Sequence, residues 1–144
     1  ERDERIKRLA GKIDRVLVDA PCSGLGTLRR NPDLKWRQSP QALEELVAKQ
    51  TAILESAARL PKSGGRLVYA TCSMLPQENE AIAEAFTQAH RDFEPLDAGE
   101  LLAQLKVPEA ASLCSGGESG SRFVRLWPHR HQTDGFFAAV WQRK

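Results

Sequence analysis

Two short apolar runs, each breaking into a polar loop that carries a cysteine, limit the possible folds of this chain more than any other feature. Residues 15–18 (RVLV) lead into the glycine-containing loop 19–26, which carries Cys22, and residues 66–70 (RLVYA) lead into a loop that carries Cys72. Such runs are typical of buried strands, and open α/β sheets place their chemistry where these strands end. If the two strands are neighbours, both thiols reach the same crevice.

The segment between the two runs is predicted to form a helix that faces the core. Ser39 can cap its N-terminus, and Pro40 suits its first turn. Residues 62–65 (KSGG) are expected to end it. Its apolar residues recur at helical spacing, namely Leu43, Leu46, Val47, Ile53, Leu54 and Ala57.

The rest of the chain continues the alternation of helices and strands. Residues 1–12 are a charged helical lead-in, a further helix is expected to begin near Pro76, and residues 93–96 are a strand candidate. Segments 122–127 and 136–141 flank a turn, which is the signature of a hairpin. This order predicts an α/β fold in which helices cover a parallel sheet and an antiparallel strand is added at one edge.

Composition fits one compact domain and excludes several classes of protein. Of the 144 residues, 41% are hydrophobic and 28% are charged, and no apolar run approaches the length of a membrane span, so we expect a cytoplasmic protein. The three cysteines form no Cys-x-x-Cys pair and do not combine with the three histidines at zinc-like spacing, so no metal is expected. Cys114 is expected to have no role, since it lies in the serine- and glycine-rich segment 110–121, a predicted mobile surface loop.

Five segments, taken in order, resemble the motifs of one enzyme family. Residues 19–24 (DAPCSG) and 69–73 (YATCS) are similar to the two cysteine motifs of the RNA 5-methylcytosine methyltransferases, which include the bacterial 16S ribosomal RNA enzymes and the eukaryotic nucleolar Sun-type proteins. Residues 29–36 (RRNPDLKW), 75–80 (LPQENE) and 134–137 (DGFF) match further segments of that family. The resemblance implies a methyltransferase that acts on cytosine in RNA, with 16S ribosomal RNA as the expected partner.

The resemblance also implies a fold and a cofactor. The family has a Rossmann-like S-adenosylmethionine-dependent methyltransferase fold, here expected as parallel strands with an antiparallel C-terminal hairpin. The family binds its cofactor with a glycine-rich loop after the first strand of the sheet, and no such loop precedes Val16. We therefore expect residues 1–144 to be the C-terminal part of one catalytic domain, inactive without the cofactor-binding part of the sheet. The exposed sheet edge would favour association.

The same resemblance assigns roles to the two cysteines. Carbon 5 of cytosine is too poor a nucleophile to take a methyl group, but a thiolate adding at carbon 6 turns the ring into an enamine that can. The family's nucleophile is the cysteine of the Thr-Cys motif, which implies Cys72. The family uses the Pro-Cys cysteine for release of the product, which implies Cys22.

Residues beside the cysteines are implied to support the reaction. Asp19 would hold the base by accepting from its exocyclic amine, and Asp19 and Pro21 would contact the cofactor. Thr71 and Ser73 flank the nucleophile and would supply hydrogen bonds that favour the thiolate.

A basic cluster after the Cys22 loop is the expected RNA-binding surface. It offers phosphate contacts and one flat ring for stacking, and consists of Arg29, Arg30, Lys35, Trp36 and Arg37. Further residues that would extend it are Arg122, Arg125, Arg130, His129 and His131. The alternative is a solvated basic loop with the tryptophan packed into the core. The target base must be unpaired or flipped, because a thiol cannot reach carbon 6 within a stacked helix.

The sequence allows three other interpretations of the cysteine loops. A lone cysteine after an apolar strand is usually a small buried hydrophobe. The chain could also be a noncatalytic RNA-binding module that keeps the loops. Redox or phosphatase chemistry is disfavoured, because no Cys-x-x-Cys exists and Leu28 stands where a phosphatase loop starting at Cys22 needs arginine.

Overall fold

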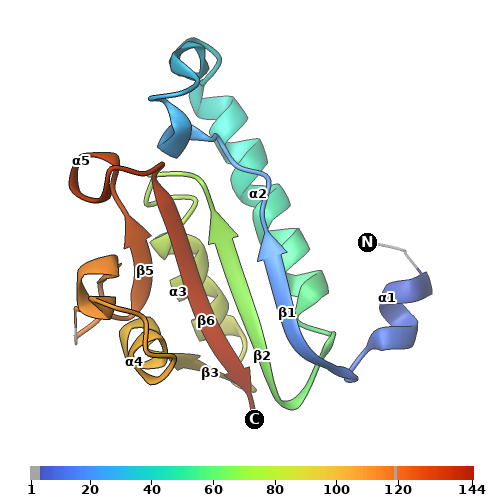
Figure 1. Cartoon of the computed structure of the whole chain (residues 1–144). Coiled ribbons are helices and arrows are strands. Elements are labelled where there is room, and N and C mark those ends of the chain that lie inside the picture. The colour runs from blue at the N-terminus through green and yellow to red at the C-terminus, as the bar shows by residue number, and fades with distance from the viewer. Residues whose placement is uncertain (1–3, 119) are drawn as a thin grey trace.

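The chain forms a mixed six-stranded sheet with two long helices packed on one face (Figure 1). The computed structural model describes residues 4–118 and 120–144. The elements in chain order are α1 (Glu4–Leu9), β1 (Ile13–Asp19), the 3-10 helices η1 (Leu25–Thr27) and η2 (Pro32–Trp36), α2 (Pro40–Ala57), β2 (Pro61–Thr71), α3 (Glu80–Ala89), β3 (Phe93–Leu96), α4 (Ala98–Gln104), η3 (Ala110–Leu113), β4 (Cys114–Ser115), β5 (Phe123–Leu126), α5 (Pro128–His131) and β6 (Phe136–Arg143).

Strands β1 and β2 are parallel neighbours, as the two apolar runs predict. Their register pairs Val16 with Leu67 and Asp19 with Ala70, so both strands end at the same edge of the sheet. Helices α2 and α3 lie together behind these strands in Figure 1. The core between helices and sheet contains Val16, Leu54, Leu67, Tyr69, Phe86 and Trp141, all buried.

The antiparallel strand β6 lies inside the sheet, so the expectation that it is added at one edge is wrong. One side of β6 pairs with β2, and the other side pairs with both β3 and β5. Phe137, Ala138, Ala139 and Trp141 are all buried in β6. A strand this uniformly apolar is stabilised where neighbours cover it on all sides, which an edge position does not provide. The predicted β5–β6 hairpin is confirmed.

Several predicted boundaries shift. Helix α2 begins as expected, with the Ser39 hydroxyl accepting from the Ala42 N–H at 3.1 Å, but it ends at Ala57 and residues 62–65 belong to β2. Helix α3 begins at Glu80 instead of near Pro76, because a turn occupies the preceding residues. The segment predicted as a mobile loop contains η3 and β4 among its described residues.

The N-terminal helix is shorter than predicted. Within the predicted lead-in 1–12 it covers Glu4–Leu9, and residues 1–3 lie outside the described residues. No helix in residues 4–118 and 120–144 is long and apolar enough to cross a membrane.

Candidate active site

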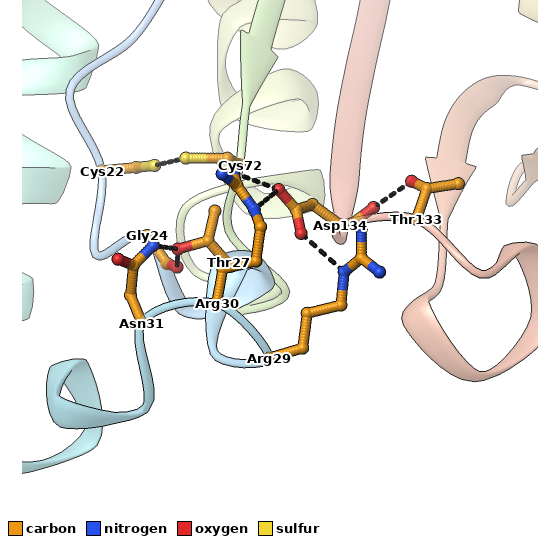
Figure 2. A network of polar contacts seen from close by, with 9 residues as sticks. All are labelled: Cys22, Gly24, Thr27, Arg29, Arg30, Asn31, Cys72, Thr133 and Asp134. Carbon is orange, nitrogen blue, oxygen red and sulfur yellow. Dashed lines mark hydrogen bonds and ion pairs between the residues drawn. The ribbon is translucent and has the colours of Figure 1, made fainter.

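The two cysteine loops meet at the C-terminal ends of β1 and β2. The Cys22 and Cys72 sulfurs lie 3.4 Å apart and both side chains are half-buried (Figure 2). The sequence predicts that neighbouring strands bring the two thiols together, and the structure places them in contact. A pocket of about 450 Å³ is lined by Cys22 and Ser23. Two half-buried sulfurs in contact can act on the same part of a bound molecule.

Close backbone contacts hold the Cys22 loop against the Cys72 loop. The Gly26 N–H donates to the Cys72 carbonyl at 2.8 Å, and the Gly26 carbonyl accepts from the Gly135 N–H at 2.7 Å. A Cβ on Gly26 would lie only 2.5 Å from the Cys72 carbonyl oxygen. Glycine is therefore required there, because any side chain would push the two loops apart.

A fully buried carboxylate joins the residues that follow each cysteine. One oxygen of Glu78 accepts from the Ser23 N–H at 2.8 Å and from the Gln50 amide at 3.0 Å. Its other oxygen accepts from the Ser23 hydroxyl at 2.6 Å and from the Ser73 hydroxyl. Gln50 also donates to the Pro21 carbonyl at 2.9 Å. Glu78 thus connects both cysteine loops to α2.

The hydroxyls beside Cys72 do not fulfil the predicted role. Thr71 donates to the Asn79 side-chain oxygen at 2.5 Å and accepts from the Ser73 N–H at 3.1 Å. The Ser73 hydroxyl donates to Glu78. The expectation that both hydroxyls donate to the nucleophile is wrong, because they donate instead to Asn79 and Glu78, two buried acceptors in the turn before α3. Their contacts hold the loop backbone in place.

The Cys22 thiol is held in its protonated form. Burial, followed by the hydrogen bond with Cys72, raises the pKa of Cys22 to about 12. A thiol that keeps its proton can donate a hydrogen bond to a neighbouring sulfur. Cys22 is therefore suited to stabilise negative charge on Cys72.

Two arginines of the expected RNA-binding cluster are paired with an acidic residue of the hairpin turn. Asp134 accepts from Arg29 Nε at 2.8 Å and from Arg30 Nε at 2.9 Å and Arg30 Nη2 at 2.5 Å (Figure 2). These hydrogen bonds with Arg30 and Arg29 lower the pKa of the Asp134 carboxyl. Both arginines remain exposed, with 49% and 62% of their side-chain surface accessible.

The remaining members of the cluster are exposed. Trp36 is 78% exposed, so the alternative in which it packs into the core does not hold, and the Lys35 ammonium lies 4.8 Å from its ring centre. Arg37 pairs with Asp33 at 2.8 Å. Arg125 is buried, pairs with Glu80 and lies over the Phe137 ring. The expectation that Arg125 extends the basic surface is therefore wrong.

Asp19 and Pro21 lie exposed at the end of β1. Among the described residues, no hydrogen bond or ion pair engages the Asp19 carboxylate. It stands at one end of a groove of about 640 Å³ between β1 and α2, whose lining is mostly apolar and includes Lys49. No group of three or more potential metal ligands occurs in residues 4–118 and 120–144.

Sequence reasoning missed the residues that organise the site. Glu78 and Asn79 fall in the recognised segment 75–80, but no role was expected for them. Gln50 is fully buried between Val47 and Leu54 on the core-facing side of α2. A single polar residue on an apolar helix face is the signal that could have identified it.

Comparison with known proteins agrees with the resemblance of the motifs. The family model described as 16S rRNA methyltransferase RsmB/F matches residues 2–142. A curated relative, the probable ribosomal RNA small subunit methyltransferase B of Synechocystis sp., is 46% identical over 129 residues, which are 88% of this chain and 26% of that protein. The chain spans about a quarter of the length of such relatives.

Two solved structures share the fold. The crystal structure of PH0851 has a TM-score of 0.78 and 40% identity, over 93% of this chain and 27% of that one. The crystal structure of NSun6 from Pyrococcus horikoshii with SFG, an S-adenosylmethionine analogue, has a TM-score of 0.71 and 27% identity, over 96% of this chain and 32% of that one.

Proposed function

This chain belongs to the 16S rRNA methyltransferase RsmB/F family, and from that membership we propose that it carries the reacting cysteines of an RNA cytosine-5 methyltransferase. The expected substrate is 16S ribosomal RNA in the cytoplasm. The observation that carries the proposal is the contact between Cys22 and Cys72, with 3.4 Å between the sulfurs, at the ends of two parallel strands. Cysteines that served only as small hydrophobic side chains would not need to be half-buried and in contact at the ends of two strands.

Cys72 is the proposed nucleophile. Its sulfur bonds to carbon 6 of cytosine, and the electron pair of the ring double bond moves to carbon 5. Carbon 5 would then take the methyl group of S-adenosylmethionine, as the bond between that methyl group and the positively charged sulfur breaks and S-adenosylhomocysteine leaves. Water takes the proton from carbon 5, the ring double bond re-forms, and the bond between carbon 6 and sulfur breaks with its electron pair returning to Cys72. The enzyme thus recovers its thiol.

Cys22 is proposed to assist release. Its raised pKa keeps the proton on its sulfur at neutral pH, so the thiol can donate to Cys72 as that sulfur leaves the ring with negative charge. Without the Cys22 proton, the adduct forms but persists.

Asp19 is the proposed contact for the base and the cofactor. The carboxylate is exposed at the end of β1 and is engaged by no other described residue, so its oxygens are available to amine or hydroxyl donors. The exposed Pro21 beside it would add an apolar contact. S-adenosylmethionine carries amino and hydroxyl groups, and cytosine carries an exocyclic amine, so both molecules can donate hydrogen bonds to this carboxylate.

The surface around Trp36 is proposed to bind RNA. The exposed ring of Trp36 can stack on an unpaired base, and the Lys35 ammonium beside it can contact phosphate. Arg29, Arg30 and Arg37 add exposed positive charge on the same stretch of chain. These exposed cationic and aromatic side chains support the proposal of an RNA-binding surface on the segment that follows Cys22.

We also propose that the chain is the C-terminal part of its catalytic domain. β1 is the last strand on its side of the sheet, and the apolar groove beside it is open. The cofactor-binding strands of the fold would pair with this edge and complete the cofactor site next to Asp19.

A trapping experiment on the full-length protein tests the reaction. With RNA and S-adenosylmethionine, Cys22→Ala should accumulate a covalent RNA–protein adduct that denaturing gels and mass spectrometry detect. Cys72→Ala should form no adduct and transfer no methyl group, whereas Cys114→Ala should behave as wild type. Methyl transfer by Cys72→Ala would exclude it as the nucleophile. RNA binding without any methyl transfer by the wild type would favour the noncatalytic module.

A further inference from the structure

We propose that Glu78 is a positioning residue that sets the distance between the Cys22 and Cys72 sulfurs. The inference rests on the proposed two-cysteine reaction and adds a residue to it. Glu78 touches neither sulfur. It acts through the serine that follows each cysteine, Ser23 and Ser73.

The hydrogen bonds around Glu78 use its whole accepting capacity. A carboxylate accepts about four hydrogen bonds, and four donors surround Glu78: the Ser23 N–H, the hydroxyls of Ser23 and Ser73, and the Gln50 amide. Ser23 and Ser73 are one residue from Cys22 and Cys72. Each cysteine backbone is therefore one peptide unit from an anchor on the same carboxylate.

The position of this carboxylate is costly to maintain. Glu78 is fully buried, and no Lys, Arg or His side chain among the described residues forms an ion pair with it. A buried charge without a cationic partner is expensive unless hydrogen bonds replace its water. Packing alone would favour an apolar residue here. A carboxylate at this position is explained if Glu78 serves to hold the Cys22 loop and the Cys72 loop together through Ser23 and Ser73.

The anchor also fixes the two loops to the helical layer. Gln50 on α2 donates both to Glu78 and to the Pro21 carbonyl, which precedes Cys22. The hydroxyl of Tyr69 on β2 donates to the Glu78 backbone carbonyl at 2.6 Å. Hydrogen bonds therefore join the helix, the strand and both loops at Glu78, and loss of the carboxylate would remove its bonds to both serines.

The test compares Glu78→Gln with Glu84→Gln in the full-length protein. Glu84 is exposed on α3, so its variant is a matched control. Phenylarsine oxide, without RNA or cofactor, measures the thiol pair: its arsenic bonds two neighbouring sulfurs at once and releases water. Cys72→Ser gives the baseline for all other thiols. Methyl transfer kinetics provide kcat and KM for RNA separately.

Glu78→Gln should weaken arsenical binding at the pair about tenfold and lower kcat about 100-fold, because a displacement of about 1 Å has effects of this size. KM for RNA should stay within about twofold, since Glu78 is buried away from the RNA-binding surface. Glu84→Gln should match wild type in all three. Wild-type arsenical affinity in a folded Glu78→Gln protein would overturn the proposal, as would a loss confined to KM.

A second variant covers the case in which Glu78→Gln does not fold. Gln50→Met keeps the side-chain volume but removes one donor to Glu78, and should shift arsenical affinity and kcat in the same direction by less. Unchanged values in Gln50→Met would then overturn the proposal. Failure of the wild type to methylate cytosine would refute the proposed function, whereas the arsenical measurement would still decide the role of Glu78.

Discussion

The Cys22 thiol owes its raised pKa to two separable causes, burial and the neighbouring sulfur of Cys72. Both act in the resting site, where the proton stays on Cys22. In the proposed adduct Cys72 is no longer a thiol, so its hydrogen bond and its charge would no longer raise the Cys22 pKa. Proton affinity at Cys22 therefore depends on the covalent state of Cys72, which links release to completed attack.

This dependence predicts that Cys72→Ala lowers the pKa of Cys22. Only the thiolate reacts with iodoacetamide. A pKa of about 12 keeps the thiolate of Cys22 scarce in the wild type at pH 8 to 9, whereas the variant should show faster labelling there. Peptide mass spectrometry across pH resolves Cys22 from other thiols, with Cys114→Ala as control. Coincident pH profiles for wild type and Cys72→Ala would contradict the interpretation.

At the level of elements, the turn between α5 and β6 holds the basic loop after η1 in place. Asp134 bonds two successive arginines of that loop, Arg29 and Arg30, across more than a hundred residues of sequence. One carboxylate cannot neutralise two guanidinium groups, so the pair keeps net positive charge facing solvent. The bonds from Asp134 hold the loop in one conformation, and the negative charge of Asp134 also weakens the attraction of Arg29 and Arg30 for phosphate.

Asp134→Asn should therefore strengthen nonspecific RNA binding and slow catalysis. Freed guanidinium groups can contact phosphate, so the salt dependence of log Kobs should steepen by about 1, while kcat falls because the loop beside Cys72 is no longer held. Salt titrations with a single-stranded oligonucleotide measure the first effect. Asp92→Asn is the control, since Asp92 pairs with Arg143 at the far end of β6. Weaker RNA binding by Asp134→Asn at low salt would contradict the prediction.

Local patterns predict β1, β2 and α2 because each carries its own periodic apolar signal. They do not predict the place of β6, since pairing on both of its sides depends on strands distant in sequence. The same limit applies to the site. The motifs locate Cys22 and Cys72. From the sequence, however, Glu78 looks like an ordinary residue near the start of a helix, because its partners Ser23 and Gln50 are distant along the chain and meet it only in the folded structure.

Viewed as a whole molecule, the sheet is covered unequally. Alternate residues of a strand face opposite sides: Val16 and Val18 are buried in the core, whereas Leu17 between them is 68% exposed. The register aligns Leu17 with Val68 of β2, and Val68 with Val140 of β6. These side chains form an apolar row on the face away from α2 and α3. A row of this kind is expected to be covered when the rest of the domain is present.

Leu17→Glu tests that expectation, because the substitution should lower the free energy of unfolding much more in the full-length protein than in the chain alone. In the chain alone the side chain is already exposed, so the free energy of unfolding should change by less than about 0.5 kcal/mol. In the full-length protein, burial of an unpaired charge should cost about 3 kcal/mol or more. Leu105→Glu, at a leucine that is 69% exposed at the C-terminal end of α4, should be harmless in both. Denaturant titrations of the four variants and their two parent proteins decide the matter. Equal small costs for Leu17→Glu would mean that this face stays open to solvent and that the cofactor-binding part docks elsewhere.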